Sequence, residues 1–168
     1  HRDVVCKEFE DYVYRELNID LAGLLLLIQR DSLKSTFSHG VLPLGFALRM
    51  KHLHNEDARI LLCHHKESQA SANLQRLKLK TSHPWMKKVW PEFTIAEGDD
   101  LGTKLAFSWP CAQRGRTSES SVMASGMGGR MTGYHFHLRI NDDIVTEEHR
   151  DSKVIRDEAF DKYTAMRF

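Results

Sequence analysis

Cysteine is scarce in this sequence, and a long apolar segment is absent. The chain has three cysteines, Cys6, Cys63 and Cys111, and no two of them have the C-x-x-C spacing. An odd number of widely spaced cysteines excludes a disulfide framework and predicts a reducing compartment. The longest apolar run is Leu21–Ile28, which is far shorter than the roughly 20 residues of a membrane-spanning helix. We therefore expect no membrane partner.

An excess of one charge sign is also absent. Lys plus Arg number 24 and Asp plus Glu number 23, so the formal net charge is +1. A protein that coats nucleic acid would be far more basic, although a near-neutral chain can still carry a local basic patch. With 41% hydrophobic and 28% charged residues, the composition predicts a globular domain and excludes a fibre or a disordered tail. The 168 residues predict one domain, and the first residue, His rather than Met, leads us to expect a truncated piece.

Apolar patterning predicts alternating helices and strands. Predicted helices cover residues 4–17, 35–54 with an interruption near Pro43, 68–80 and 146–168. Predicted strands cover residues 21–28, 58–64, 104–109, 121–125 and 134–141. Proline and tryptophan mark predicted loops at 83–85 and 90–92. The alternation implies an α/β layered fold, in which 21–28 is a strand buried on both faces, with a buried helix as the alternative.

A phosphate-binding loop is predicted where the first strand gives way to a helix. In a P-loop, backbone N–H groups surround the phosphates, a lysine reaches the outer phosphates and a hydroxyl binds Mg²⁺. The pattern is G-x-x-x-x-G-K-[ST], but Ile28 and Leu33 stand at the two glycine positions, so only Lys34 and Ser35 match. The helix that follows would add a dipole that favours anions. An ordinary strand–helix corner is the alternative.

Two adjacent carboxylates form the second candidate site. The partly apolar segment from His135 ends in Asp142 and Asp143. In P-loop ATPases an Asp at the end of such a strand holds Mg²⁺, and a following acid can activate the attacking water. Asp142 would then be the metal-side carboxylate and Asp143 the base. The alternative is a polar turn in which Asp caps a helix, although the order of the two sites along the chain favours the ATPase.

With both sites in view, the chain resembles the ATPase region of the large terminase subunit of tailed bacteriophages. The deviant Walker A motif of that family often reads Arg-x-x-Leu-Lys-Ser-Thr, and Arg30–Thr36 resembles it. A glycine-rich lead into Walker B is similar to Ala124–His135 and continues through Asn141–Glu148. The segment Trp90–Phe93 also resembles the family, and the likeness extends over about Leu21 to Phe168.

The resemblance implies both a fold and an activity. The implied fold is a P-loop NTPase of the additional-strand class, with a mostly parallel sheet flanked by helices. We expect residues 1–168 to form a single, truncated ATPase domain. The implied activity is ATP hydrolysis, with ATP and Mg²⁺ as cofactors, that drives double-stranded DNA into a procapsid. The implied location is the procapsid vertex in the host cytoplasm. The implied partners are DNA, the portal protein, the small terminase subunit and further copies in a ring. The family's nuclease domain is absent from this stretch, so we expect no nuclease activity.

Roles for individual residues also follow from the resemblance. It implies that ATP is bound by seven consecutive residues: Arg30, Asp31, Ser32, Leu33, Lys34, Ser35 and Thr36. Ser35 and Asp142 would hold Mg²⁺, while Lys34 and Asp143 would be catalytic. Asp143 stands where many relatives carry Glu and is one methylene shorter. Arg130 is the candidate arginine finger for a neighbouring subunit, with three alternatives: Arg114, Arg116 and Arg150. Each of these could equally be a surface arginine.

Other interpretations remain open at this point. The sequence also allows a catalytically weak fragment that only binds nucleotide, DNA or the portal, or a helicase-like translocase. Local histidine pairs could hold a transition metal, but none has structural zinc spacing: the pairs are 52/54, 64/65 and 135/137. Basic residues near Trp85 and Trp90 could follow a DNA backbone. Because their charges spread around a helix rather than along one stripe, a solvated helix face followed by a packed Trp loop is favoured.

Overall fold

The structure is a computed structural model that describes residues 34–96, 102–112, 119–129, 133–146 and 152–165. The helix predicted at 4–17 and the strand predicted at 21–28 lie outside the described residues. The predictions at 58–64, 68–80 and 121–125 fall on a strand, a helix and a strand of the structure, and are confirmed.

The described chain begins with one continuous helical segment. It consists of α2 (Lys34–Thr36), η1 (Phe37–Val41), α3 (Leu42–Arg49) and η2 (Met50–His54), of which η1 and η2 are π-helical. The predicted interruption near Pro43 is wrong. A proline inside a helix removes a hydrogen bond, and the wider π-helical turn directly before α3 accommodates this loss without ending the helix.

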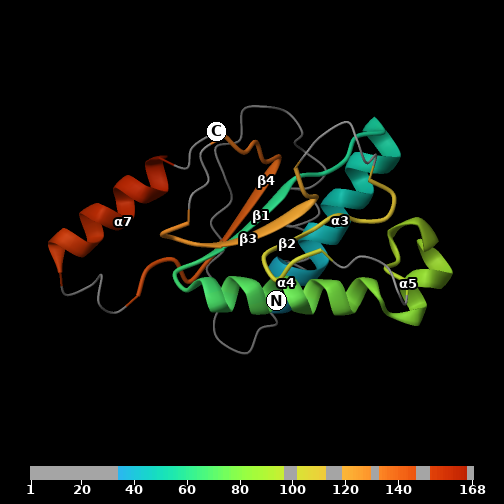
Figure 1. Ribbon diagram of the computed structural model, residues 1–168, viewed down its shortest axis with the longest axis horizontal. Coiled ribbons are helices and arrows are strands. Elements are labelled where there is room, and N and C mark those ends of the chain that lie inside the picture. Colours follow the sequence, from blue (N-terminus) through green and yellow to red (C-terminus); the bar gives the residue numbers. More distant parts are fainter. Residues whose placement is uncertain (1–33, 97–101, 113–118, 130–132, 147–151, 166–168) are drawn as a thin grey trace.

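In the described part of the chain the sheet has four strands, labelled in Figure 1: β1 (Ile60–His64), β2 (Ala106–Phe107), β3 (Val122–Gly126) and β4 (Leu138–Asp142). Their order is β2-β3-β1-β4. β1 is parallel to both β3 and β4, whereas β2 pairs antiparallel with β3. The fold is therefore α/β with a mixed sheet, only part of which is parallel.

Three further helices follow among the residues that the structure describes: α4 (Glu67–Thr81), α5 (Pro84–Val89) and α7 (Lys153–Ala165). A short 3-10 turn, η3, covers Pro91–Phe93. The loops predicted at 83–85 and 90–92 are wrong in part, because Pro84 opens α5 instead of breaking the chain. Proline is favoured in a first helical turn, where its missing N–H costs no hydrogen bond. No helix in the described part of the chain is long and apolar enough to cross a membrane.

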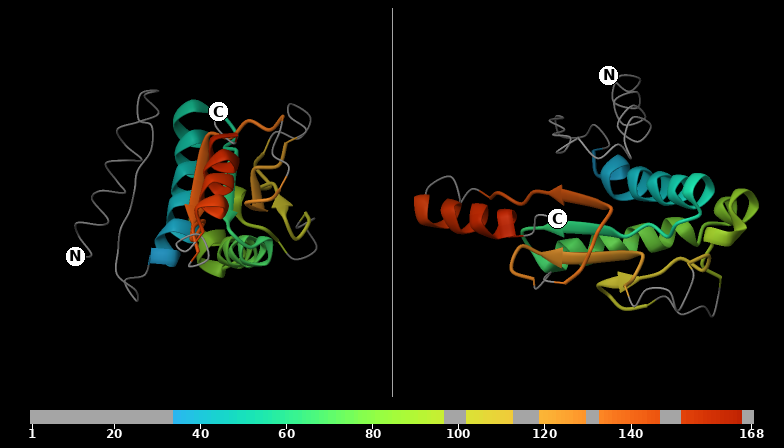
Figure 2. Two further views of the ribbon diagram at one scale, coloured as in Figure 1. Left: turned by 90° about the vertical axis from the view of Figure 1, so that its left-hand side faces the viewer. Right: turned by 90° about the horizontal axis from the view of Figure 1, so that it is seen from above.

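One face of the sheet carries the hydrophobic core. Side chains alternate between the faces of a strand, so the register places Ile60 and Leu62 of β1 on the same face as their partners in β3 and β4. These residues share one core with side chains from α3 and α4: Phe46, Met50, Leu74 and Leu77. The ribbon of α4 runs along the strands of the sheet (Figure 2). The two helices therefore cover the face of the sheet to which Ile60 and Leu62 belong. By the same alternation, His64 at the end of β1 lies on this face.

The carboxyl ends of the parallel strands lie at one edge of the sheet. In the register, His64 at the end of β1 is the partner of Gly126 in β3 and of Asp142 in β4. In open α/β sheets, ligands bind outside the carboxyl ends of the strands. A Cβ added to Gly126 would lie 2.9 Å from the backbone nitrogen of Glu67. Glycine is therefore required for α4 to begin this close to the edge.

Candidate functional site

Lys34 reaches the two carboxylates at the end of β4. Its Nζ lies 2.9 Å from Asp142 Oδ1 and 3.6 Å from Asp143 Oδ1. The side chain of Asp142 is 11% exposed and that of Asp143 is 68% exposed. The hydrogen bond to Asp142 is the main reason that the pKa of Lys34 is raised, and burial opposes it. The structure thus brings together three site residues that the sequence places in two separate motifs.

The other predicted site residues divide into two groups. Ser35 and Thr36 complete α2 directly after Lys34 and are exposed. The remaining residues of the predicted phosphate loop lie outside the described residues: Arg30, Asp31, Ser32 and Leu33. The four candidate arginine fingers also lie outside them: Arg130, Arg114, Arg116 and Arg150. The described part of the site is therefore the helix start and the strand end, which face each other.

The backbone of Asp143 turns away from the strand direction. Asp143 has φ of 44°, in the left-handed region that residues other than glycine rarely adopt. Its carbonyl oxygen is 2.9 Å from Nδ1 of His65, which follows the end of β1. This contact joins the segments after β1 and β4 at the backbone of Asp143.

His39 is a site residue that the sequence analysis missed. It lies in η1 and is only 3% exposed, and its Nε2 is 3.6 Å from Asp142 Oδ2. Lys34 and His39 therefore contact different oxygens of the same carboxylate. A signal was available in the sequence, because His39 is four residues after Ser35 and residues at that spacing share one face of a helix.

A chain of hydrogen bonds determines the orientation of His39. Arg76 Nη1 donates to Asn73 Oδ1 at 3.3 Å, which leaves Asn73 Nδ2 to donate to His39 Nε2 at 3.2 Å. The neutral ring then carries its proton on Nδ1, next to Ser38 Oγ at 3.1 Å, and Ser38 donates to the Lys34 carbonyl at 3.0 Å. Burial is the main cause of the lowered pKa of His39. Every donor in this chain has an acceptor when the ring is neutral.

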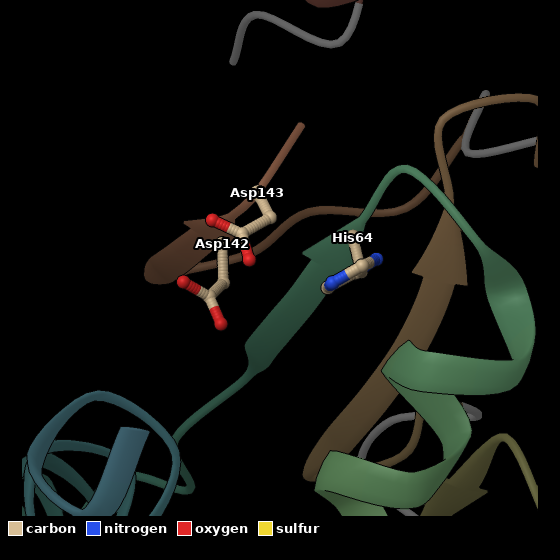
Figure 3. A group of neighbouring side chains, drawn as sticks. All are labelled: His64, Asp142 and Asp143. Carbon is tan, nitrogen blue, oxygen red and sulfur yellow. The ribbon is translucent and has the colours of Figure 1, made fainter. Parts of the chain in front are cut away.

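His64 completes a group of three possible metal ligands with Asp142 and Asp143 (Figure 3). One ligand atom from each residue lies within 4.8 Å of the others. The backbone N–H of Lys66 donates to His64 Nδ1 at 3.1 Å, so a neutral ring carries its proton on Nε2. Burial, followed by the neighbouring His65, lowers the pKa of His64. Of the predicted histidine pairs, only His64 belongs to this group of possible ligands among the described residues.

The donor set fits a hard cation better than a soft one. Carboxylate oxygens are the ligands that Mg²⁺ prefers, whereas imidazole suits transition metals. The hydrogen bond from Lys66 to His64 Nδ1 places the ring proton on the nitrogen that a metal would need. His64 is therefore better suited to donate a hydrogen bond to a carboxylate than to bind an ion directly. The oxygen donors of this group are the carboxylates of Asp142 and Asp143.

Comparison with known proteins gives no family for this chain. No family model, no curated protein and no solved structure matches it. The functional interpretation therefore depends on the residues and geometry of the site.

The lowered pKa of His39 predicts stability that is lost in acid. An unfolded histidine protonates near pH 6.5, whereas burial keeps the folded ring neutral to lower pH. As the pH falls below about 6.5, the unfolded state binds more protons than the folded state, so the free energy of unfolding decreases. We expect urea unfolding at about pH 7.5 and about pH 5.5 to show that the free energy of unfolding decreases less between these pH values in His39→Gln than in the wild type. The exposed control His54→Gln should behave like the wild type, and equal losses in all three proteins would contradict the prediction.

Proposed function

We propose that this chain is the ATP-hydrolysing motor domain of a phage terminase large subunit, which drives double-stranded DNA into a procapsid. The observation that carries the proposal is the contact of Lys34 with Asp142 and Asp143. A lysine at a helix start and two acids at a strand end are the parts that a P-loop ATPase needs around its nucleotide. Their proximity supports a P-loop NTPase fold of the additional-strand class.

Lys34, Ser35 and Thr36 would bind the phosphates at the start of the helical segment. The first backbone N–H groups of a helix lack partners within the helix, and together with the helix dipole they favour anions. Arg30 and the residues up to Leu33 would complete the loop. A raised pKa keeps Lys34 charged, so when ATP arrives its Nζ can exchange the carboxylates for phosphate oxygens.

Asp142 and Ser35 would hold Mg²⁺ through oxygen atoms. When bound, the ion offsets negative charge on the phosphates. Nε2 of the buried His39 lies 3.6 Å from the other oxygen of Asp142, and with the ring proton on Nδ1 it donates no hydrogen bond to that oxygen. The contact with Lys34 therefore orients the carboxylate before any ligand binds.

Asp143 would orient the attacking water and accept its proton. Its side chain is exposed, as a group that meets solvent water must be. An aspartate is one methylene shorter than the glutamate of many relatives, and the left-handed backbone at Asp143 changes the direction in which the short side chain extends. In a ring of subunits, Arg130 from a neighbouring copy would stabilise the charge that develops during phosphoryl transfer.

The remaining parts of the proposal concern partners and place. Double-stranded DNA, the portal protein and the small terminase subunit would be the partners, at the procapsid vertex in the host cytoplasm.

A second candidate function is a module that binds nucleotide, DNA or the portal without hydrolysing ATP. It is favoured by the ion pair itself, because Lys34 is already neutralised by two carboxylates, and by the lack of glycine at positions 28 and 33. A helicase-like translocase would use the same ATP site and would differ in what it does to DNA.

Replacement of Lys34 tests whether the site binds nucleotide. Lys34→Ala should abolish Mg-ATP binding in titration calorimetry, because no other described residue of the helix start supplies a cation to the phosphates. Lys104→Ala, at an exposed lysine away from the site, should bind ATP like the wild type. Equal affinity in the Lys34→Ala variant would contradict the proposed phosphate loop.

Replacement of Asp143 separates hydrolysis from binding. Asp143→Asn keeps the size of the side chain but removes the base, and loss of one general base typically costs about 10²–10⁴-fold in rate. Phosphate release should therefore fall by this amount while calorimetry still detects Mg-ATP binding. Asp57→Asn, which alters a carboxylate paired with Lys51, is the control for general effects. Unchanged turnover in Asp143→Asn would assign the base to another residue.

A further inference from the structure

The sequence between Glu67 and Glu92 contains no acidic residue. Over the same stretch it carries several basic residues, in a chain whose net charge is only +1: Arg76, Lys78, Lys80, Lys87 and Lys88. The structure folds this stretch into α4 and α5, which follow one another directly at Ser82 and His83 (Figure 1). Positive charge is therefore concentrated on these two helices.

Four of these five basic residues are exposed. Lys78 is 5% exposed, donates a hydrogen bond to the Thr103 carbonyl and lies 5.5 Å from the centre of the Phe107 ring, so it belongs to the packing. The others form an exposed set, which we call the basic surface: Arg76, Lys80, Lys87 and Lys88. Arg76 and Lys80 are four residues apart and share one side of α4. The apparent spread of charge around the helix comes from the buried Lys78.

The lysines of the basic surface have no carboxylate partner among the residues that the structure describes. Elsewhere, Lys51 pairs with Asp57 at 2.9 Å and Arg59 pairs with Glu119 at 2.8 Å. Among the described residues, no ion pair joins Lys80, Lys87 or Lys88 to a carboxylate. Burial, and then the like charge of Arg76, lower the pKa of Lys80. Neighbouring cations without counter-charges favour an anionic partner.

We propose that the basic surface binds the phosphate backbone of double-stranded DNA. A duplex carries closely and regularly spaced phosphates, which several separate cations can contact at once. Lysine acts as a flexible point charge, so such contacts position DNA without reading its sequence. The choice of DNA as partner rests on the proposed function, whereas the surface itself rests on exposure and charge.

Exposed apolar residues beside the basic surface suggest a competing partner. Trp85 is 53% exposed and Leu79 is 73% exposed, and Trp85 packs edge-on against Trp90 with ring centres 5.3 Å apart. Cations next to a tryptophan also suit an anionic membrane surface. We favour DNA because the cations come from two helices, whereas membrane-surface helices present one continuous apolar face.

The basic surface is also connected to the candidate ATP site. Arg76 contacts Asn73, and Asn73 contacts His39, whose Nε2 lies 3.6 Å from Asp142 Oδ2. A phosphate that draws Arg76 away from Asn73 would therefore alter the hydrogen bonds of the residue beside Asp142. A surface that DNA occupies while ATP is hydrolysed would need such a connection.

The test is equilibrium binding of a fluorescently labelled duplex to the whole chain without nucleotide. The double variant Lys87→Gln/Lys88→Gln is compared with Lys66→Gln/Lys153→Gln, which removes the same charge from exposed lysines outside the basic surface. Each phosphate contact that is lost reduces the slope of log affinity against log salt by about 1. We expect the first variant to lose about 2 from this slope and roughly tenfold in affinity, with little change in the second.

Several outcomes would overturn the proposal. Equal losses of DNA affinity in the two variants would show an effect of net charge alone. If the wild type binds no duplex, DNA is not the partner of this surface. If anionic phospholipid vesicles bind the wild type and release the first variant while DNA binding is unchanged, the surface belongs to a membrane. ATP calorimetry on the same proteins keeps the two proposals apart: selective loss of DNA binding supports the surface even if no ATP binds.

Discussion

The ion pair between Lys34 and Asp142 joins the two halves of the candidate site. It connects the start of the helical segment to the end of β4, and no regular secondary structure links these two points directly. A partly exposed ion pair contributes only about 0–1 kcal/mol to stability. Burial of one large apolar side chain contributes about 1.5–3 kcal/mol, and the core contains many of them. The pair is therefore too weak to hold the fold together and can be exchanged for a ligand without unfolding.

The rest of the structure determines where this ion pair can form. The parallel register places His64 beside Asp142, and the glycine at 126 lets α4 start close to the same edge. The side chains of α3 and α4 share the core with the sheet, which places His39 and Asn73 between the helices at the end of that core. Apolar packing supplies the stability, and the polar residues at the edge are left to contact a ligand.

Part of this arrangement could be predicted from the sequence. A short apolar run identifies β1 and helical periodicity identifies α4, because each of these signals lies within one short segment. The roles of the prolines could not be predicted in the same way. Proline disfavours the interior of a helix but is favoured at its start. Whether the chain stays helical at Pro43 and Pro84 is determined by the turns next to them. Lys34 and Asp142 were each predicted as site residues from local motifs.

The residues that the sequence did not identify depend on tertiary contacts. His39 looks like any other histidine until η1 packs against α4, where Asn73 and Asp142 contact its ring. The basic surface is similar: the sequence suggests charge around a helix, and only burial separates Lys78 from its neighbours. Periodicity describes one element at a time, whereas these features depend on how two elements meet.

The most direct test of the central claim is a crystal structure of the chain with Mg²⁺ and a non-hydrolysable ATP analogue. The account predicts that Lys34 Nζ leaves Asp142 and contacts a phosphate oxygen, with the ion between Asp142, Ser35 and the phosphates. His39 should keep its contact with Asp142. A structure with the nucleotide bound elsewhere, or with the Lys34–Asp142 ion pair intact beside it, would contradict the account.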